Sequence, residues 1–67
     1  MNTLKHYRQQ AGLTQAALAE RAGIDVRMVQ HYEQGQKPLD KAAAITVLNL
    51  ARVLGCSVAD LIDPKNS

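Results

Sequence analysis

Residues 12–35 read GLTQAALAERAGIDVRMVQHYEQG, and this stretch decides the fold. It contains two segments of about two helical turns each, separated by a short turn around Gly23. Thr14 and Asp25 stand immediately before the two segments, where a side-chain oxygen accepts hydrogen bonds from the first free amides of a helix. A glycine follows each segment, as is common where a helix ends in a left-handed conformation. The predicted helices cover residues 15–22 and 26–34.

The same signals divide the rest of the chain. Thr3, Asp40 and Ser57 are further predicted caps, and Ser57 with Asp60 has the spacing of a capping box. The predicted helices outside the central stretch cover residues 4–10, 41–54 and 58–62. The resulting fold class is all-α, a compact five-helix bundle with a lengthened fourth helix.

The composition agrees with a single small helical domain over residues 1–67. With 67 residues, the chain is close to the lower size limit of an independently folding domain. Ala and Leu supply 18 residues and aromatic residues only 3%, a mixture that favours helices over strands. The net charge of +2 and the pI of about 9.0 are compatible with nucleic-acid binding and with an ordinary soluble domain.

The sequence lacks the patterns of catalytic and metal sites. His6 and His31 are 25 residues apart with no Cys or carboxylate at ligand spacing, and Ser57 has no neighbouring His. Cys56 is the one cysteine, which excludes an intrachain disulfide and fits a small buried side chain in a reducing compartment. The first residues do not have the pattern of a signal segment, and no apolar run is long enough to suggest a membrane span. We therefore expect a cytoplasmic protein that is not an enzyme and needs no metal or cofactor.

Apolar spacing predicts the core. One face of the fourth helix forms a core stripe of Ala43, Ala44, Val47, Leu50, Ala51 and Leu54. The small residues that allow the two central helices to cross closely are Ala16, Ala19 and Ala22. Leu18 and Val29 are expected to meet beneath that crossing. Ile45 and Val53 fall on a flanking face, either as scattered surface apolar residues or as part of a subunit contact.

The predicted helix at 26–34 has two different faces. Its inner side carries Val26, Val29, Tyr32 and Glu33, and its polar side carries Arg27, Gln30, His31 and Gln34. Arg can bind guanine and Gln can bind adenine through paired hydrogen bonds, so the polar side suits base recognition in a major groove. Taken alone, a polar stripe is more typical of any solvated helix face. After a short capped helix and a glycine turn, it favours a helix-turn-helix over residues 14–34.

Five segments resemble the Cro and phage-repressor family of helix-turn-helix regulators, also named after the xenobiotic response element. The segments are LKxxR, GLTQxxLA, AGI, YExG and LARVLGCSVADLI, in the family's order over residues 4–62. The resemblance implies a lambda-repressor-like domain and a bacterial or phage-type transcriptional regulator. Such a regulator, acting as a repressor, inserts its third helix into the major groove of double-stranded DNA.

The resemblance also implies roles for residues of the third helix. Arg27, Gln30 and His31 match positions that face base edges. Val26 flanks them and either touches a thymine methyl group or packs. Met28 also flanks them, as a base contact, as packing at the phosphate rim, or as surface filling.

The expected phosphate contacts are Gln15, Lys37, Lys41 and Gln34. Gln15 matches a glutamine that opens the family's second helix and contacts phosphate, at a position where free helix amides also favour an anion. Lys37 and Lys41 stand in for the family's loop contacts, or are solvated surface lysines. Arg8 and Glu33 match a recurrent ion pair between the first and third helices, which we expect to be structural.

One recognition helix reads only a few base pairs, so we expect a homodimer on a pseudo-palindromic site. The candidate dimer face consists of Ile45, Val53, Val58, Leu61 and Ile62. The alternative function is a protein-interaction module, such as an antitoxin or adaptor, that binds a protein partner through the same aliphatic face.

Overall fold

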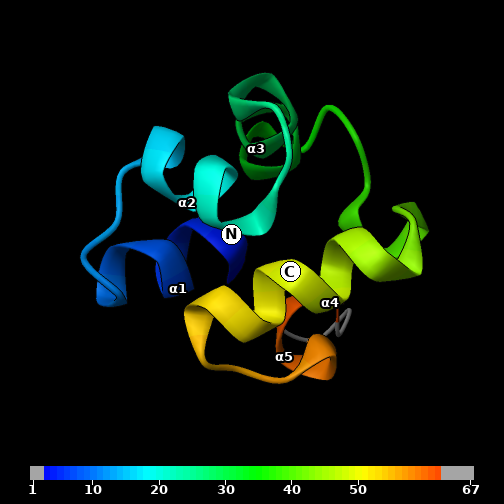
Figure 1. Cartoon of the computed structure of the whole chain (residues 1–67). Helices are drawn as coiled ribbons and strands as arrows, with labels where there is room; N and C mark the ends of the chain where they lie inside the picture. The colour runs from blue at the N-terminus through cyan, green and yellow to red at the C-terminus, as the bar shows by residue number, and fades with distance from the viewer. Residues whose placement is uncertain (1–2, 63–67) are drawn as a thin grey trace.

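The computed structural model describes residues 3–62 and contains no strand within that range. Its elements are α1 (Thr3–Gln10), α2 (Gln15–Ala22), α3 (Val26–Gln34), the 3-10 helix η1 (Leu39–Lys41), α4 (Ala44–Leu54) and α5 (Val58–Ile62). Figure 1 shows these helices wrapped around a common centre. The predicted all-α, five-helix fold class is confirmed. The predicted domain also included residues 1–2 and 63–67, which lie outside the described residues.

The two central helices begin at their predicted caps. The Oγ1 of Thr14 accepts a hydrogen bond from the Ala17 amide at 3.0 Å, and Asp25 Oδ1 accepts one from the Arg27 amide at 2.8 Å. Gly23 closes α2 with a φ of +72°, a left-handed conformation that favours glycine. A Cβ at this position would meet no atom within 4 Å, so the backbone angle and not lack of space requires the glycine.

The first and last helices are joined to each other. The Thr3 hydroxyl donates a hydrogen bond to the Leu61 carbonyl oxygen at 3.0 Å. Thr3 was predicted to cap α1 from outside, but it is the first residue of the helix and its side chain contacts α5 instead. At the start of α5, the predicted capping box is confirmed, because Ser57 and Asp60 exchange reciprocal hydrogen bonds of 3.0 and 3.1 Å.

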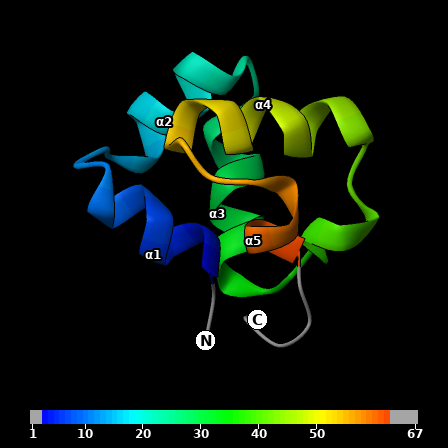
Figure 2. The ribbon, with the colours of Figure 1, turned by 90° about the horizontal axis from the view of Figure 1, so that it is seen from below.

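The core lies where all five α-helices meet. Its buried members are Leu4, Leu18, Ala19, Ala22, Val29, Tyr32, Val47, Leu50, Ala51 and Leu61. Leu18 and Val29 are both completely buried, as the predicted helix crossing requires. The packing of α2 against α3 is the most extensive between two elements, and α4 covers α2 from another side. The helix α3 also contacts α1, whereas α5 packs against α1, α4 and η1. In Figure 2, which views the molecule from below, α5 lies in front of α3.

The prediction that the fourth helix begins at Lys41 and is capped by Asp40 is wrong. Residues 39–41 form η1, and the chain is extended at Ala42, with φ −69° and ψ 161°, before α4 begins at Ala44. The physical reason is tertiary packing, because Leu39 and Ala42 both pack against the core. In a continuous helix Ala42 would lie off the core stripe of α4.

Three alanines that were predicted to lie in the core are exposed in the structure. Ala43 and Ala44 are exposed, since α4 starts only there. Leu54 at the far end of α4 is half-buried and packs against the core, in agreement with the prediction. In α2, Ala19 and Ala22 are buried but Ala16 is exposed. The close helix crossing therefore depends on two of the three small residues that the sequence suggested.

Candidate nucleic-acid interface

The helix α3 separates its buried and polar sides as the sequence indicates. Val29 is completely buried and Tyr32 is 6% exposed, whereas Arg27 on the opposite side is exposed. The other polar-side residues are Gln34, which is exposed, and Gln30 and His31, which are half-buried. The structure therefore leaves a row of hydrogen-bonding side chains along one side of α3.

The two apolar residues that flank this row are partly occupied by packing. Val26 and Met28 are half-buried and lie against the core cluster. A part of each side chain is therefore buried in the protein, and the rest is accessible. The sequence-based hypothesis that they also contact bases stays a prediction.

An ion pair joins α1 to α3. The Nε of Arg8 lies 2.7 Å from Glu33 Oε2, and Arg8 Nη2 donates to Oε1 at 3.1 Å, so the pair is bidentate. The Arg8 and Glu33 side chains are 12% and 3% exposed. Nη1 of Arg8 also donates to the Leu13 carbonyl oxygen at 2.8 Å, which fixes the loop before α2. The predicted contact between Arg8 and Glu33 is thus present in the structure, with geometry typical of the stronger ion pairs.

The structure adds a third member that the sequence did not predict. The Nε2 of Gln15, the first residue of α2, donates to Glu33 Oε1 at 3.1 Å. Glu33 therefore accepts hydrogen bonds from side chains of both α1 and α2. Gln15 and Glu33 are 18 residues apart, and no local sequence signal marks a contact of this kind.

The two candidate lysines lie on the connection between α3 and α4. Lys37 and Lys41 are both exposed, and no ion pair of theirs is found within the described range. The Lys37 amide donates to the His31 carbonyl oxygen at 3.4 Å, which ties the start of this connection to the last turn of α3. Both ammonium groups are thus accessible on the segment that follows α3.

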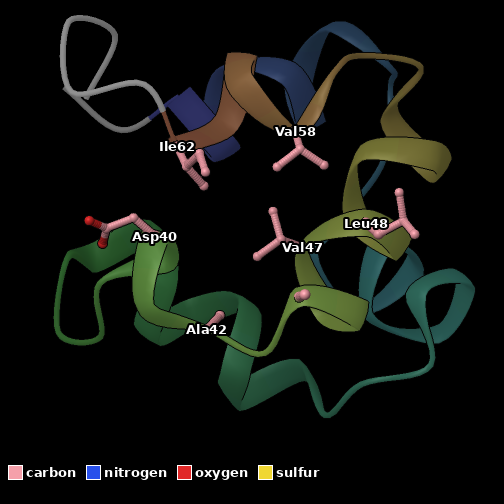
Figure 3. A pocket seen from close by; sticks show the side chains of 7 residues that line it. Asp40, Ala42, Val47, Leu48, Val58 and Ile62 are labelled. Carbon is pink, nitrogen blue, oxygen red and sulfur yellow. The ribbon is translucent and has the colours of Figure 1, made fainter.

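An apolar groove of about 380 Å³ lies between η1, α4 and α5. It is lined by Asp40, Ala42, Ala44, Val47, Leu48, Val58 and Ile62. Figure 3 shows Val58 and Ile62 on α5 facing Val47 on α4, with the Asp40 carboxylate at one end. The exposed large hydrophobic residues of the described part are Ile45, 62% exposed, and Leu48, 37% exposed.

The residues that form the accessible aliphatic surface differ from those predicted. Leu61 is only 2% exposed and belongs to the core, so its inclusion in a dimer face is wrong. Val53 is half-buried and packs against the core. Leu48 was missed, although it stands three residues after Ile45 and so on the same side of the helix. The accessible aliphatic surface is centred on Ile45, Leu48 and the groove.

The fold and this polar helix define a class of protein. Two short helices joined by a glycine turn, the second with an accessible polar side, form a helix-turn-helix. The chain belongs to a family of helix-turn-helix domains, because the model for that family matches residues 2–63. Since the motif binds DNA, this membership indicates DNA binding and transcription regulation.

The other comparisons add no relative. Searches of curated proteins and of solved structures gave no match. Within residues 3–62, no helix is both long and apolar enough to span a membrane. The same range contains no group of three or more His, Cys, Asp or Glu side chains placed to hold a metal ion.

Proposed function

We propose that this protein is a sequence-specific DNA-binding transcriptional regulator of the Cro and phage-repressor type, acting as a repressor. In the proposed complex, α3 enters the major groove of an operator. The observation that carries the proposal is the accessible polar side of α3 opposite its buried Val29 and Tyr32. Repression is the simplest outcome, since a protein bound at an operator excludes other proteins from the same DNA.

The polar side of α3 supplies the proposed base contacts. Arg27 is exposed in the first turn of α3, and its guanidinium group matches the two acceptors of guanine. Gln30 and His31 lie one turn further along, and Gln30 matches the adenine edge. Val26 and Met28 border these residues and contribute any contact to thymine methyl groups.

Phosphate contacts would hold the domain in register. Gln15 begins α2, where backbone amides without helical partners and the helix dipole favour a phosphate. Lys37, Lys41 and Gln34 are exposed at the end of α3 and beyond it. In this proposal these four residues fix position, and α3 reads sequence.

The test is a selection from random duplexes with the purified protein, followed by affinity measurements on the enriched sequence. Arg27→Ala should raise the Kd for the enriched duplex about 5- to 150-fold per half-site, as expected for a bidentate base contact. Affinity for an unrelated duplex should change little. The matched control is Arg52→Ala, because Arg52 is another exposed arginine and lies on α4.

Two results would contradict base reading by α3. The selection could return no enriched sequence, with weak binding that falls steeply with salt and ignores Arg27, which is the behaviour of phosphate contact alone. Alternatively, Arg27→Ala and Arg52→Ala could weaken binding equally. The effect of Arg27 would then come from its positive charge and not from recognition of a base.

We further propose that the regulator acts as a homodimer that pairs through the groove between η1, α4 and α5. The structure spans 26 × 21 × 20 Å, whereas half-sites one helical turn apart are separated by about 34 Å. A single copy is therefore too short to place a helix in both major grooves. Two-fold symmetry requires a self-complementary surface. The exposed large hydrophobic residues here are Ile45 and Leu48, and Leu48 also lines the groove.

The size of a stable interface agrees with that surface. A standard interface buries about 800 Å² on each partner, roughly a fifth of the 4215 Å² accessible surface of this chain. Such an interface needs most of one side of the molecule, with the groove at its centre. A different protein bound in the same groove is the second candidate function, and the oligomeric state distinguishes the two.

A further inference from the structure

The Gln15 amide is held in one orientation by Glu33. A carboxylate only accepts hydrogen bonds, so the amide must turn its Nε2 end, and not its Oε1 end, toward Glu33 at 3.1 Å. Nε2 carries two N–H groups, and Glu33 accepts from one of them. The second N–H stays on the same end of the side chain and is able to donate to an acceptor outside the protein.

Glu33 is itself held in place. Its side chain is 3% exposed, and both carboxylate oxygens accept from Arg8, at 2.7 Å to Nε and 3.1 Å to Nη2. Arg8 is in turn anchored on the Leu13 carbonyl oxygen, one residue before the Thr14 cap of α2. The acceptor that orients Gln15 is thus fixed by contacts to α1 and to the loop before α2.

We propose that Glu33 is a positioning residue for DNA binding, which presents the Nε2 end of Gln15 to a phosphate oxygen of the DNA backbone. This inference rests on the proposed function. Glu33 is part of α3, so the bond sets the distance between the phosphate contact and the base-reading side chains of the same helix. Glu33 touches no DNA and acts through Gln15.

The mechanism predicts a particular pattern of affinities. A phosphate contact carries no sequence information, so its loss weakens binding to every duplex by the same factor. For one hydrogen bond to a charged phosphate that factor is about 10- to 150-fold in Kd per half-site. A general distortion of α3 would instead weaken operator binding more than non-specific binding.

The experiment is a double-mutant cycle of Glu33→Gln and Gln15→Ala, with Kd measured on the selected operator and on an unrelated duplex. Glu33→Gln should weaken both complexes by the same factor in the wild-type background. It should cause no further loss in the Gln15→Ala background. As a control, Gln10→Ala removes an exposed glutamine at the end of α1 and should leave both affinities unchanged.

A purely structural role for Glu33 predicts the same loss of affinity in both backgrounds, and that result would overturn the inference. If Glu33→Gln is unfolded by circular dichroism, the cycle is run with Glu33→Asp. Aspartate keeps the charge for Arg8 but draws the carboxylate back from Gln15 by one methylene group.

The binding measurements distinguish an error in the proposed function from an error in this inference. If the wild-type chain binds neither duplex, the proposed function and this inference fall together. If the wild type binds its operator through Arg27 but the cycle is additive, the inference alone is wrong.

Discussion

At the scale of single residues, Glu33 links three helices, because groups on α1 and α2 both donate to this residue of α3. The Arg8 contact was expected because Arg8 and Glu33 match a recurrent ion pair of the family that the sequence resembles, with two opposite charges at otherwise apolar interfaces. The Gln15 contact could not, because a glutamine at the start of a helix is as compatible with solvent as with a carboxylate. Which acceptor lies beside it depends on how α2 and α3 cross.

Cys56 provides a prediction at this scale. Partial burial raises the pKa of its thiol, and the negative charge of Asp60 raises it further. The folded protein should therefore react more slowly with iodoacetamide near pH 8 than the same chain unfolded in urea, since the thiolate is the reactive form. Asp60→Asn should speed the reaction, because an amide still accepts from the Ser57 amide but carries no charge.

The raised pKa of the Cys56 thiol also determines the direction in which its contribution to stability changes with pH. The unfolded chain loses the thiol proton at a lower pH than the folded chain, so this contribution to stability is complete below the unfolded pKa. It is lost as the pH rises through the folded pKa. Equal alkylation rates in the folded and unfolded chains would contradict the pKa direction.

At the scale of elements, local signals located the helices that have local caps. Thr14, Asp25 and Ser57 each satisfy amides a few residues away, so α2, α3 and α5 begin where the sequence predicts. The start of α4 was wrong because it has no side-chain cap and depends on Leu39 and Ala42 packing against distant helices. The spacing of residues along the chain does not show whether this packing or a longer helix is more stable.

The turn between α2 and α3 gives a prediction at this scale. Gly23→Ala should lower the free energy of unfolding by roughly 1–2 kcal/mol, the strain of a left-handed conformation for an L-residue with a Cβ. No clash adds to it, since the space around the Cβ position is open. Urea denaturation measures the change. Gly55→Ala is a matched control at the end of α4, with φ +70° and the same open space, and should cost a similar amount.

The two glycine variants should differ in DNA binding. Gly23 lies inside the helix-turn-helix, so a shift of its backbone alters how α3 is held, whereas Gly55 lies between α4 and α5. Under conditions where both variants are folded, only Gly23→Ala should weaken operator binding. For stability, a decrease of several kcal/mol in the free energy of unfolding of Gly23→Ala would indicate a steric clash and contradict the open space around this position.

At the scale of the whole molecule, the groove lies where η1, α4 and α5 come together, with η1 packed against α5. No stretch of sequence describes it, because its walls come from three elements whose relative placement follows from the core. The sequence did indicate an aliphatic face, but it included buried Leu61 and omitted Leu48. Exposure depends on packing, whereas spacing along one helix reveals only which residues share a side.

The proposed homodimer gives the prediction at this scale. Sedimentation equilibrium of the wild-type chain should show a concentration-dependent dimer. Ile45→Glu should raise its dissociation constant at least about 10-fold, because a carboxylate would be buried in each half of the interface. Leu48→Glu should act in the same direction. Ala11→Glu, at an exposed position after α1, is the control and should leave the dimer unchanged.

Two outcomes would argue against a second copy in the groove. A wild-type chain that stays monomeric at every concentration, with and without operator, would exclude the homodimer. A dimer unaffected by Ile45→Glu and Leu48→Glu would locate the interface elsewhere.

The hydrogen bond between Thr3 and the Leu61 carbonyl oxygen has a consequence for how the domain comes apart. It joins positions 58 residues apart and closes the described chain into a ring of packed helices. Fraying of α1 must therefore break a contact with α5, and fraying of α5 removes buried Leu61 from the common core. Amide protons of the two terminal helices should exchange with solvent at similar rates, in step with global opening of the domain.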